Sequence, residues 1–311
     1  MASRPDSATL RAAGEVEVVA KRGLVAVAIM SVAVAAGCSK RTTSEPPLAT
    51  PSIIVNHTRA ALGSPVEVTY QFVVSADAPK VDQRYRVFVH FLDSSGELMW
   101  TDDHEPPVPT TEWTPGKTVA YTRTVFIPIY PYVGEATLRL GLYSDPQRRR
   151  VALGGEDNGQ RAYKVGTITL LPQSENVFLI YKDGWHPAEV ASDNAAVEWQ
   201  WSKREGVIAF RNPRRDATIF LHFDGRPDLV GQPQKVTLTL AGQPLDAFEL
   251  TTRDEVIKKI AVSASQFGGA DMVDLRLGVE PTFVPAQTPG AGSADQRELG
   301  IRVFHAFVEP K

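Results

Sequence analysis

Apolar and polar residues alternate along most of the chain between residues 53 and 171. In the run 66–72 every second residue is apolar, and the positions between them carry Glu, Thr and Gln. Similar runs occupy 84–91, 119–125 and 136–143. This alternation predicts β-strands that bury one face, whereas an amphipathic helix would repeat about every 3.6 residues. No stretch of the region shows a helical period, so we predict that it is all-β.

The segment Asp93-Ser94-Ser95-Gly96 separates two of these runs and has the composition of a hairpin turn. Seven or eight short strands in about 120 residues are typical of a sandwich of the immunoglobulin or fibronectin type. The short polar segment 172–176 then marks a boundary. We therefore expect a first domain over 53–171 and a second over 177–311.

The second half of the chain also consists of short, largely apolar runs separated by turn residues. Nine candidate strands lie at 178–181, 197–202, 207–211, 218–223, 235–240, 247–251, 256–262, 273–279 and 301–308. Nine strands at this spacing predict a second sandwich with a jelly-roll arrangement. The folded part of the chain is thus expected to be two tandem β-sandwiches.

The first 37 residues have the pattern of an export signal. Residues 1–22 are largely polar and end in Lys21 and Arg22, and the fifteen residues 23–37 carry no charge. A basic flank, a short apolar core and small residues at its end predict a secretory signal peptide. A membrane-spanning helix would need about 20 apolar residues. We therefore exclude residues 1–37 from the fold.

The end of this signal, Ala35-Ala36-Gly37-Cys38, resembles the lipobox of bacterial lipoproteins. The resemblance implies cleavage after Gly37 and acylation of Cys38, which several acyl chains would hold stably in a membrane. The segment 38–52 has few large apolar residues and is predicted to be a flexible tether. Ser39 stands where enteric lipoproteins of the inner membrane have Asp. The expected location is the bacterial cell envelope, with the outer membrane favoured.

Composition excludes several classes of protein. The 311 residues include a single cysteine, which excludes a disulfide framework and a cysteine-rich zinc site. The formal net charge is −3, which does not suggest nucleic-acid binding. The chain lacks the nucleophile elbow, zinc-protease, P-loop and dinucleotide motifs. We predict a non-enzymatic protein without a cofactor. A hydrolase built on two carboxylates stays open, because their separation cannot be read from a sequence.

Aromatic residues of the second domain are candidates for sugar binding. Trp199 and Trp201 are two positions apart and share one face of a predicted strand. If that face is outward they form a stacking platform; if it is inward they belong to the core. Trp185 lies in a predicted loop with Asp183 and Glu189, so an indole and two carboxylate acceptors could together contact a glycan.

The loop that contains Asp102, Asp103 and His104 is a weak candidate for a metal site, with His90 as a possible further ligand. Neither a calcium-type oxygen set nor a tetrahedral zinc set is complete in this segment. The alternative is a proline-locked surface loop whose polar side chains cap backbone groups. No metal is therefore assigned.

Asp295 lies two residues before Arg297 at the entry to the last predicted strand, where the two could form a structural ion pair that fixes the loop. The stretch resembles the Asp-x-Arg-x-Leu-Gly entry to the last strand in β-sandwich segments of glycosyltransferase-associated and surface-polysaccharide proteins. The resemblance implies a glycan-associated envelope context and no catalytic role.

In the first domain, the runs 88–93 and 103–110, then Trp113 and 141–143, are similar to immunoglobulin-like domains of bacterial envelope lipoproteins and membrane glycosyltransferase-associated proteins. That group implies no activity. The leading hypothesis is an envelope lipoprotein that acts as a structural or assembly component through protein partners. A carbohydrate-binding module is the alternative, and a glycan-active hydrolase is the second alternative.

Overall fold

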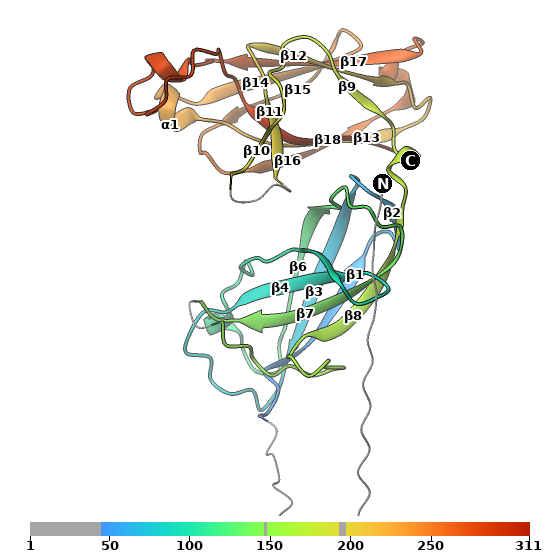
Figure 1. Ribbon diagram of the computed structural model, residues 1–311, viewed down its shortest axis with the longest axis vertical. Coiled ribbons are helices and arrows are strands. Elements are labelled where there is room, and N and C mark those ends of the chain that lie inside the picture. Colours follow the sequence, from blue (N-terminus) through green and yellow to red (C-terminus); the bar gives the residue numbers. More distant parts are fainter. Residues whose placement is uncertain (1–44, 146–147, 193–196) are drawn as a thin grey trace, which may run out of the picture. The chain divides into compact units, whose positions relative to one another are not determined.

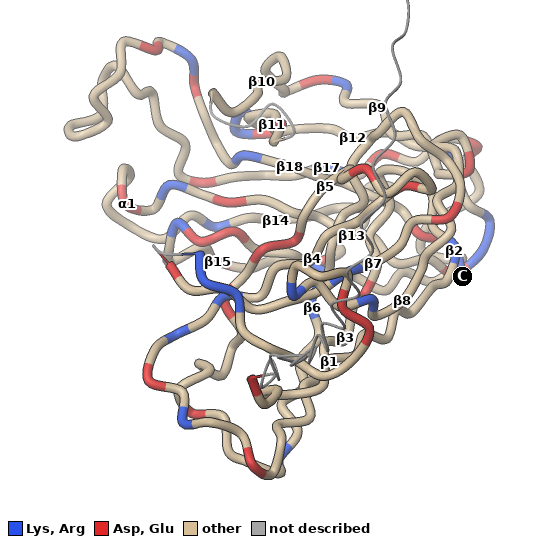
Figure 2. The backbone as a smooth tube through the Cα atoms, turned by 60° about the horizontal axis from the view of Figure 1, so that its bottom comes forward, with Lys and Arg blue, Asp and Glu red and all other residues tan. Residues whose placement is uncertain are grey.

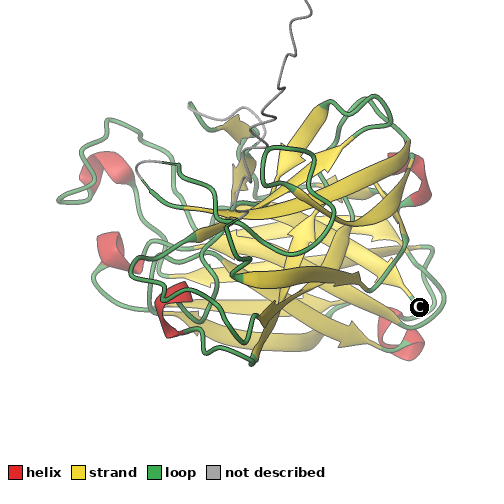
Figure 3. Ribbon diagram, turned by 90° about the horizontal axis from the view of Figure 1, so that it is seen from below, coloured by secondary structure: helices red, strands yellow, loops and turns green. Residues whose placement is uncertain are grey.

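The computed structural model describes residues 45–145, 148–192 and 197–311 (Figure 1). Strands dominate these residues, and the helical segments are short (Figure 3). The prediction of an all-β chain with several sheets is confirmed. In the described ranges no helix is long and apolar enough to cross a membrane.

The described residues of the first sandwich form eight strands. They are β1 (Ala49–Val55), β2 (Arg59–Ala61), β3 (Pro65–Val74), β4 (Arg86–Leu92), β5 (Leu98–Thr101), β6 (Thr118–Phe126), β7 (Gly134–Tyr143) and β8 (Tyr163–Leu171). One sheet has the order β1-β3-β6, and the other has the order β2-β8-β7-β4-β5. Their ladders are antiparallel except for β2 with β8, which run parallel.

The alternating residues of β3 show why this sequence forms a sandwich. Val66, Val68, Tyr70 and Phe72 are buried, while the residues between them are less so. They pack in one core with the inward residues of the opposite sheet, such as those of β4 and β7. The predicted hairpin joins β4 to β5, where the Asp93 carboxylate accepts hydrogen bonds from the backbone N–H of residues 95 and 97.

The first strand begins earlier than the sequence predicted. The expected tether 38–52 overlaps β1, which starts at Ala49, and Leu48 is already buried. The prediction failed because residues 49–52 of this edge strand are Ala, Thr, Pro and Ser, which show no strong apolar pattern and join the sheet by backbone pairing with β3. Glu45, at the start of the described part, accepts a hydrogen bond from Arg161 Nη2 at 2.7 Å.

The described residues of the second sandwich form ten strands. They are β9 (Leu179–Tyr181), β10 (Glu189–Val190), β11 (Glu198–Trp201), β12 (Glu205–Arg211), β13 (Ala217–Asp224), β14 (Gln234–Leu240), β15 (Gln243–Leu250), β16 (Val256–Val262), β17 (Met272–Glu280) and β18 (Arg302–Pro310). One sheet has the order β10-β11-β18-β13-β16, and the other has the order β15-β14-β17-β12-β9.

The core of this sandwich lies between its two sheets. Inward residues of β13, including Leu221 and Phe223, pack with inward residues of β14 and β17, including Leu238 and Leu277. Each of the nine predicted runs overlaps a strand. The sequence missed β10, which has two residues, and the single-turn helix α1 (Pro227–Val230). Both are too short to show a period.

Candidate functional site

Charged residues of both signs are interspersed along the described backbone (Figure 2). The candidate site is a local cluster of side chains. It lies on the sheet β10-β11-β18-β13-β16. In the antiparallel register Asp224 pairs with Arg302, and Arg302 pairs with Trp201. Directly paired residues project from the same side of a sheet. Because the neighbouring Phe223 and Val303 fill the core, these three side chains project from the outer side, which we call the Arg302 face.

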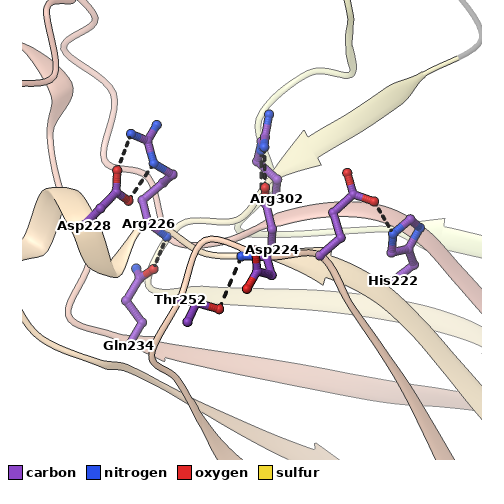
Figure 4. Close-up of polar contacts among 9 residues, drawn as sticks. His222, Asp224, Arg226, Asp228, Gln234, Thr252 and Arg302 are labelled. Atoms are coloured by element: carbon purple, nitrogen blue, oxygen red, sulfur yellow. Dashed lines mark hydrogen bonds and ion pairs between the residues drawn. The ribbon is translucent and has the colours of Figure 1, made fainter. Parts of the chain in front are cut away.

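A bidentate ion pair forms the centre of the Arg302 face. Arg302 Nε donates to Asp224 Oδ1 at 2.9 Å, and Arg302 Nη2 donates to Asp224 Oδ2 (Figure 4). Asp224 is only 2% exposed, so its charge needs this partner. A planar guanidinium gripped by a buried carboxylate has little freedom to rotate. The pair therefore fixes the guanidinium at one place on the sheet.

Three aromatic rings surround that guanidinium. Its central carbon lies 5.1 Å from the ring centre of Trp199, 5.7 Å from that of Trp201 and 5.2 Å from that of Phe304. These distances are those of cation–π contacts. Phe304 is the extra residue of a β-bulge, which lies where the pairing of β13 with β18 shifts. Bulges redirect side chains in this way next to functional sites.

A histidine pair and a glutamate extend the face. His222 Nε2 is 2.9 Å from Glu255 Oε2, and His222 Nδ1 is 3.1 Å from His305 Nδ1. The Glu255 side chain is 57% exposed and can be reached from solvent. Its hydrogen bond to His222 lowers the pKa of Glu255. Burial, reinforced by the neighbouring His222, lowers the pKa of His305 to about 4.

The loop after β13 is anchored beside this cluster. Arg226 and Asp228 form a second bidentate pair at 2.9 and 2.8 Å (Figure 4). The fully buried Gln234 accepts from the backbone N–H of Arg226 at 2.6 Å and donates to the carbonyl of Pro281 at 2.9 Å. The site therefore combines an aromatic surface, the fixed Arg302 guanidinium as a donor and the accessible Glu255 carboxylate as an acceptor. It lies beside an anchored loop at the end of β13.

Trp185 is used for packing. Its Nε1 donates to the Val207 carbonyl at 2.9 Å, and its ring meets Tyr181 edge-on at 4.8 Å between centres. A Cβ added to Gly206 would lie 2.8 Å from the indole, which shows how closely the strand supports it. The Asp183 side chain is exposed. The predicted combination of a free indole with flanking carboxylates is therefore not assembled around Trp185.

Glu189 belongs to a different cluster. It accepts from Arg297 Nη1 at 2.7 Å, while Arg297 Nη2 donates to Asp295 Oδ2, also at 2.7 Å. The hydrogen bond from Arg297 lowers the pKa of Asp295. These three side chains tie the loop before β18 to β10, an arrangement suited to a structural role.

The two strand tryptophans are both in contact with Arg302, but they differ in burial. Trp201 is 8% exposed and packs with Phe283 and Leu299. Trp199 is half-buried. Its Nε1 is buried and has no hydrogen-bond partner among the described residues. Of the candidate tryptophans, Trp199 is thus the one that lies at the surface of the Arg302 face.

The weak metal candidates lie in the first sandwich. Asp102 accepts from Tyr70 at 2.8 Å and from Arg123 Nη2 at 2.9 Å, and His104 Nε2 is 2.7 Å from the Tyr121 hydroxyl. Asp103 is exposed. No group of three or more metal-ligating side chains occurs in the part of the chain that the structure describes. Cys38 lies outside the described residues.

Sequence reasoning missed Asp224, Arg302, His222 and Glu255. Asp224 and Arg302 are 78 positions apart and meet only through strand pairing. The one local signal was the polar pair His222 and Asp224 in a largely apolar strand, both on the side opposite the core. A buried charge at such a position calls for a partner, but the pattern does not say which residue supplies it.

No protein-family model matches the chain, and no curated protein matches it. Among solved structures, the family GH115 4-O-methyl-α-glucuronidase BtGH115A, with specificity for decorated arabinogalactans, has 12% identity and a TM-score of 0.32 over 49% of this chain and 20% of its own. The CBM51-2 and INT domains of Clostridium perfringens ZmpB have 10% identity and a TM-score of 0.24 over 57% and 38%.

SGBP-B of the Bacteroides ovatus mixed-linkage glucan utilization locus, in complex with a mixed-linkage heptasaccharide, has 11% identity and a TM-score of 0.27 over 84% of this chain and 53% of its own. The chain spans between a fifth and about half of the length of these three structures. Similarity at this level assigns no function. The β-sandwich architecture rests on the strands and sheets described above.

Proposed function

We propose that the protein is a non-enzymatic, lipid-anchored component of a bacterial cell envelope whose second sandwich binds glycans at the Arg302 face. The observation that carries this proposal is the convergence of Trp199, Phe304 and the Asp224-held Arg302 guanidinium beside the exposed Glu255 carboxylate. A few polar groups set among aromatic surface are typical of sites for small ligands.

The chemistry of the face suits a sugar. The C–H side of a pyranose can lie against an aromatic ring, and its hydroxyls can donate to Glu255 and accept from Arg302. The lowered pKa of Glu255 keeps this side chain ionised near neutral pH, so that it serves as an acceptor and not as the proton donor that glycoside hydrolysis needs. The second carboxylate, Asp224, is occupied by Arg302. Both facts support binding over hydrolysis.

Affinity electrophoresis of the full chain against envelope polysaccharides tests the proposal. We expect retardation by at least one polysaccharide, with a change in tryptophan fluorescence. Trp199→Ala and Glu255→Gln should each remove the retardation, whereas Glu249→Gln, an exposed acid on β15 of the other sheet, should keep it. Retardation by no polysaccharide, or equal retardation of all variants, would refute glycan binding at this face.

A structural or assembly role through protein partners is the second candidate, and the edge strand β9 favours it. Ile180 on this strand is 43% exposed, and the preceding Phe178 is 76% exposed. An exposed apolar strand edge is a surface on which another chain can add a strand. In-cell crosslinking that captures one envelope protein with the wild type, and loses it with Phe178→Ser but not with Trp199→Ala, would favour this role.

The anchor is a separate part of the proposal. Acylation of Cys38 would place the described part of the chain at a membrane surface. Labelled palmitate should enter the wild-type chain and not Cys38→Ala, and unchanged labelling of the variant would remove the anchor from the proposal.

A further inference from the structure

Three side chains on the Arg302 face form one continuous line. His305 and His222 meet through their Nδ1 atoms at 3.1 Å, and His222 Nε2 continues to Glu255 at 2.9 Å. The two imidazole planes differ by 2°, with ring centres 5.4 Å apart. The rings therefore meet end to end, because the separation of their centres is close to the N···N distance plus the two ring radii. This is the geometry of an in-plane N–H···N hydrogen bond.

For neutral imidazoles, the ionised Glu255 fixes the direction of both hydrogen bonds. An ionised carboxylate can only accept, so His222 Nε2 must carry the hydrogen that faces Glu255. In a neutral imidazole the other nitrogen is then a bare acceptor. His222 Nδ1 therefore accepts, and His305 Nδ1 must donate to it. With both imidazoles neutral, the line runs from His305 through His222 to Glu255.

We propose that this line is a one-proton switch that regulates the glycan-binding face. A proton taken from solvent adds to His222 Nδ1, and His305 exchanges its own proton from Nδ1 to Nε2. The bond between the imidazoles then points from His222 to His305, and Glu255 faces an imidazolium. The histidine pair gains one proton in total. A second added proton would place the N–H groups of His222 Nδ1 and His305 Nδ1 against each other.

The surrounding charges allow this switch to operate with Glu255 still ionised. Glu255 directly precedes β16 and contacts His222, and the neighbouring charges on β13 and β18 are Asp224 and Arg302. The lowered pKa of His305, about 4, agrees with a pair that accepts its second proton with difficulty. An imidazolium-bound carboxylate is a weaker acceptor for sugar hydroxyls, so acid should weaken glycan binding. This consequence rests on the proposed function.

Nitrogen-correlated NMR of the imidazoles in the full chain tests the switch without any glycan. At pH 7.5 we expect His222 protonated on Nε2 and His305 on Nδ1. At pH 5 we expect His222 protonated on both nitrogens and His305 on Nε2 alone. His222→Gln and His305→Gln assign the signals. His305 protonated on Nε2 at pH 7.5, or simultaneous charging of both rings, would overturn the inference.

Glycan affinity then tests the coupling to the face. For a polysaccharide that binds at pH 7.5, we expect the affinity to fall about tenfold at pH 5, the effect of losing one hydrogen bond of ordinary strength. His222→Gln should flatten this pH profile, and the exposed His57→Gln should not. A pH-independent wild-type affinity beside normal imidazole signals would overturn the coupling. Absence of binding at both pH values would refute the proposed function, while the imidazole signals would still decide the switch.

Discussion

At the level of single residues, Asp102 shows how one carboxylate holds several elements of the first sandwich. It joins Tyr70 on β3 to Arg123 on β6, and its side chain is only 11% exposed. We predict that Asp102→Asn destabilises the protein by about 2–3 kcal/mol. This is less than the loss of a fully buried partner because Arg123 is 39% exposed to screening solvent.

The neighbouring Asp103 provides a matched control for this prediction, because it is exposed and one position away. Asp103→Asn should change stability by no more than about 0.5 kcal/mol. Urea unfolding followed by fluorescence measures both variants. Equal effects of the two substitutions would show that the network around Asp102 contributes little.

At the level of elements, strands with a local alternating or apolar pattern could be predicted from the sequence. The candidate site could not, because its residues come together only through strand pairing. The alternation in β3 and the apolar run of β13 identified these strands directly. The start of the edge strand β1 was not predicted because only backbone pairing with β3 places it in the sheet. The Arg302 face was not predicted because its residues on β13 and β18 meet only through strand register. The loop tryptophan Trp185 also turned inward, since its indole finds a carbonyl partner on β12.

The contact between β12 and Trp185 makes a prediction at this scale. A Cβ at Gly206 would meet the indole at 2.8 Å, so Gly206→Ala should cost about 1–3 kcal/mol by forcing the ring to move. Gly166→Ala on β8 is the control, because no atom lies within 4 Å of its Cβ position. Unfolding curves and the tryptophan emission maximum measure the effect. A normal emission maximum and stability in Gly206→Ala would contradict the packing role of Trp185.

At the level of the whole molecule, the perturbed groups predict that stability falls on acidification in two stages. His305 has a folded pKa of about 4 against about 6.5 when unfolded, so the unfolded chain takes up its proton first. Stability should therefore drop by roughly 3 kcal/mol between pH 6.5 and 4. Asp102 and Glu255 have lowered pKa values, so their contribution is present above the unfolded pKa of about 4 and is lost below it.

Urea unfolding of the full chain at pH 7.5, 5 and 3.5 separates the two stages. His305→Gln should reduce the decline between pH 7.5 and 5, to which the lowered pKa of His90 also contributes, and leave the steeper loss at pH 3.5, since the carboxylates are untouched. The exposed His57→Gln should follow the wild type throughout. A wild-type stability that stays constant from pH 7.5 to 5 would mean that His305 accepts its proton as readily in the folded protein as in the unfolded chain. The end-to-end histidine pair would then not restrict protonation as its geometry requires.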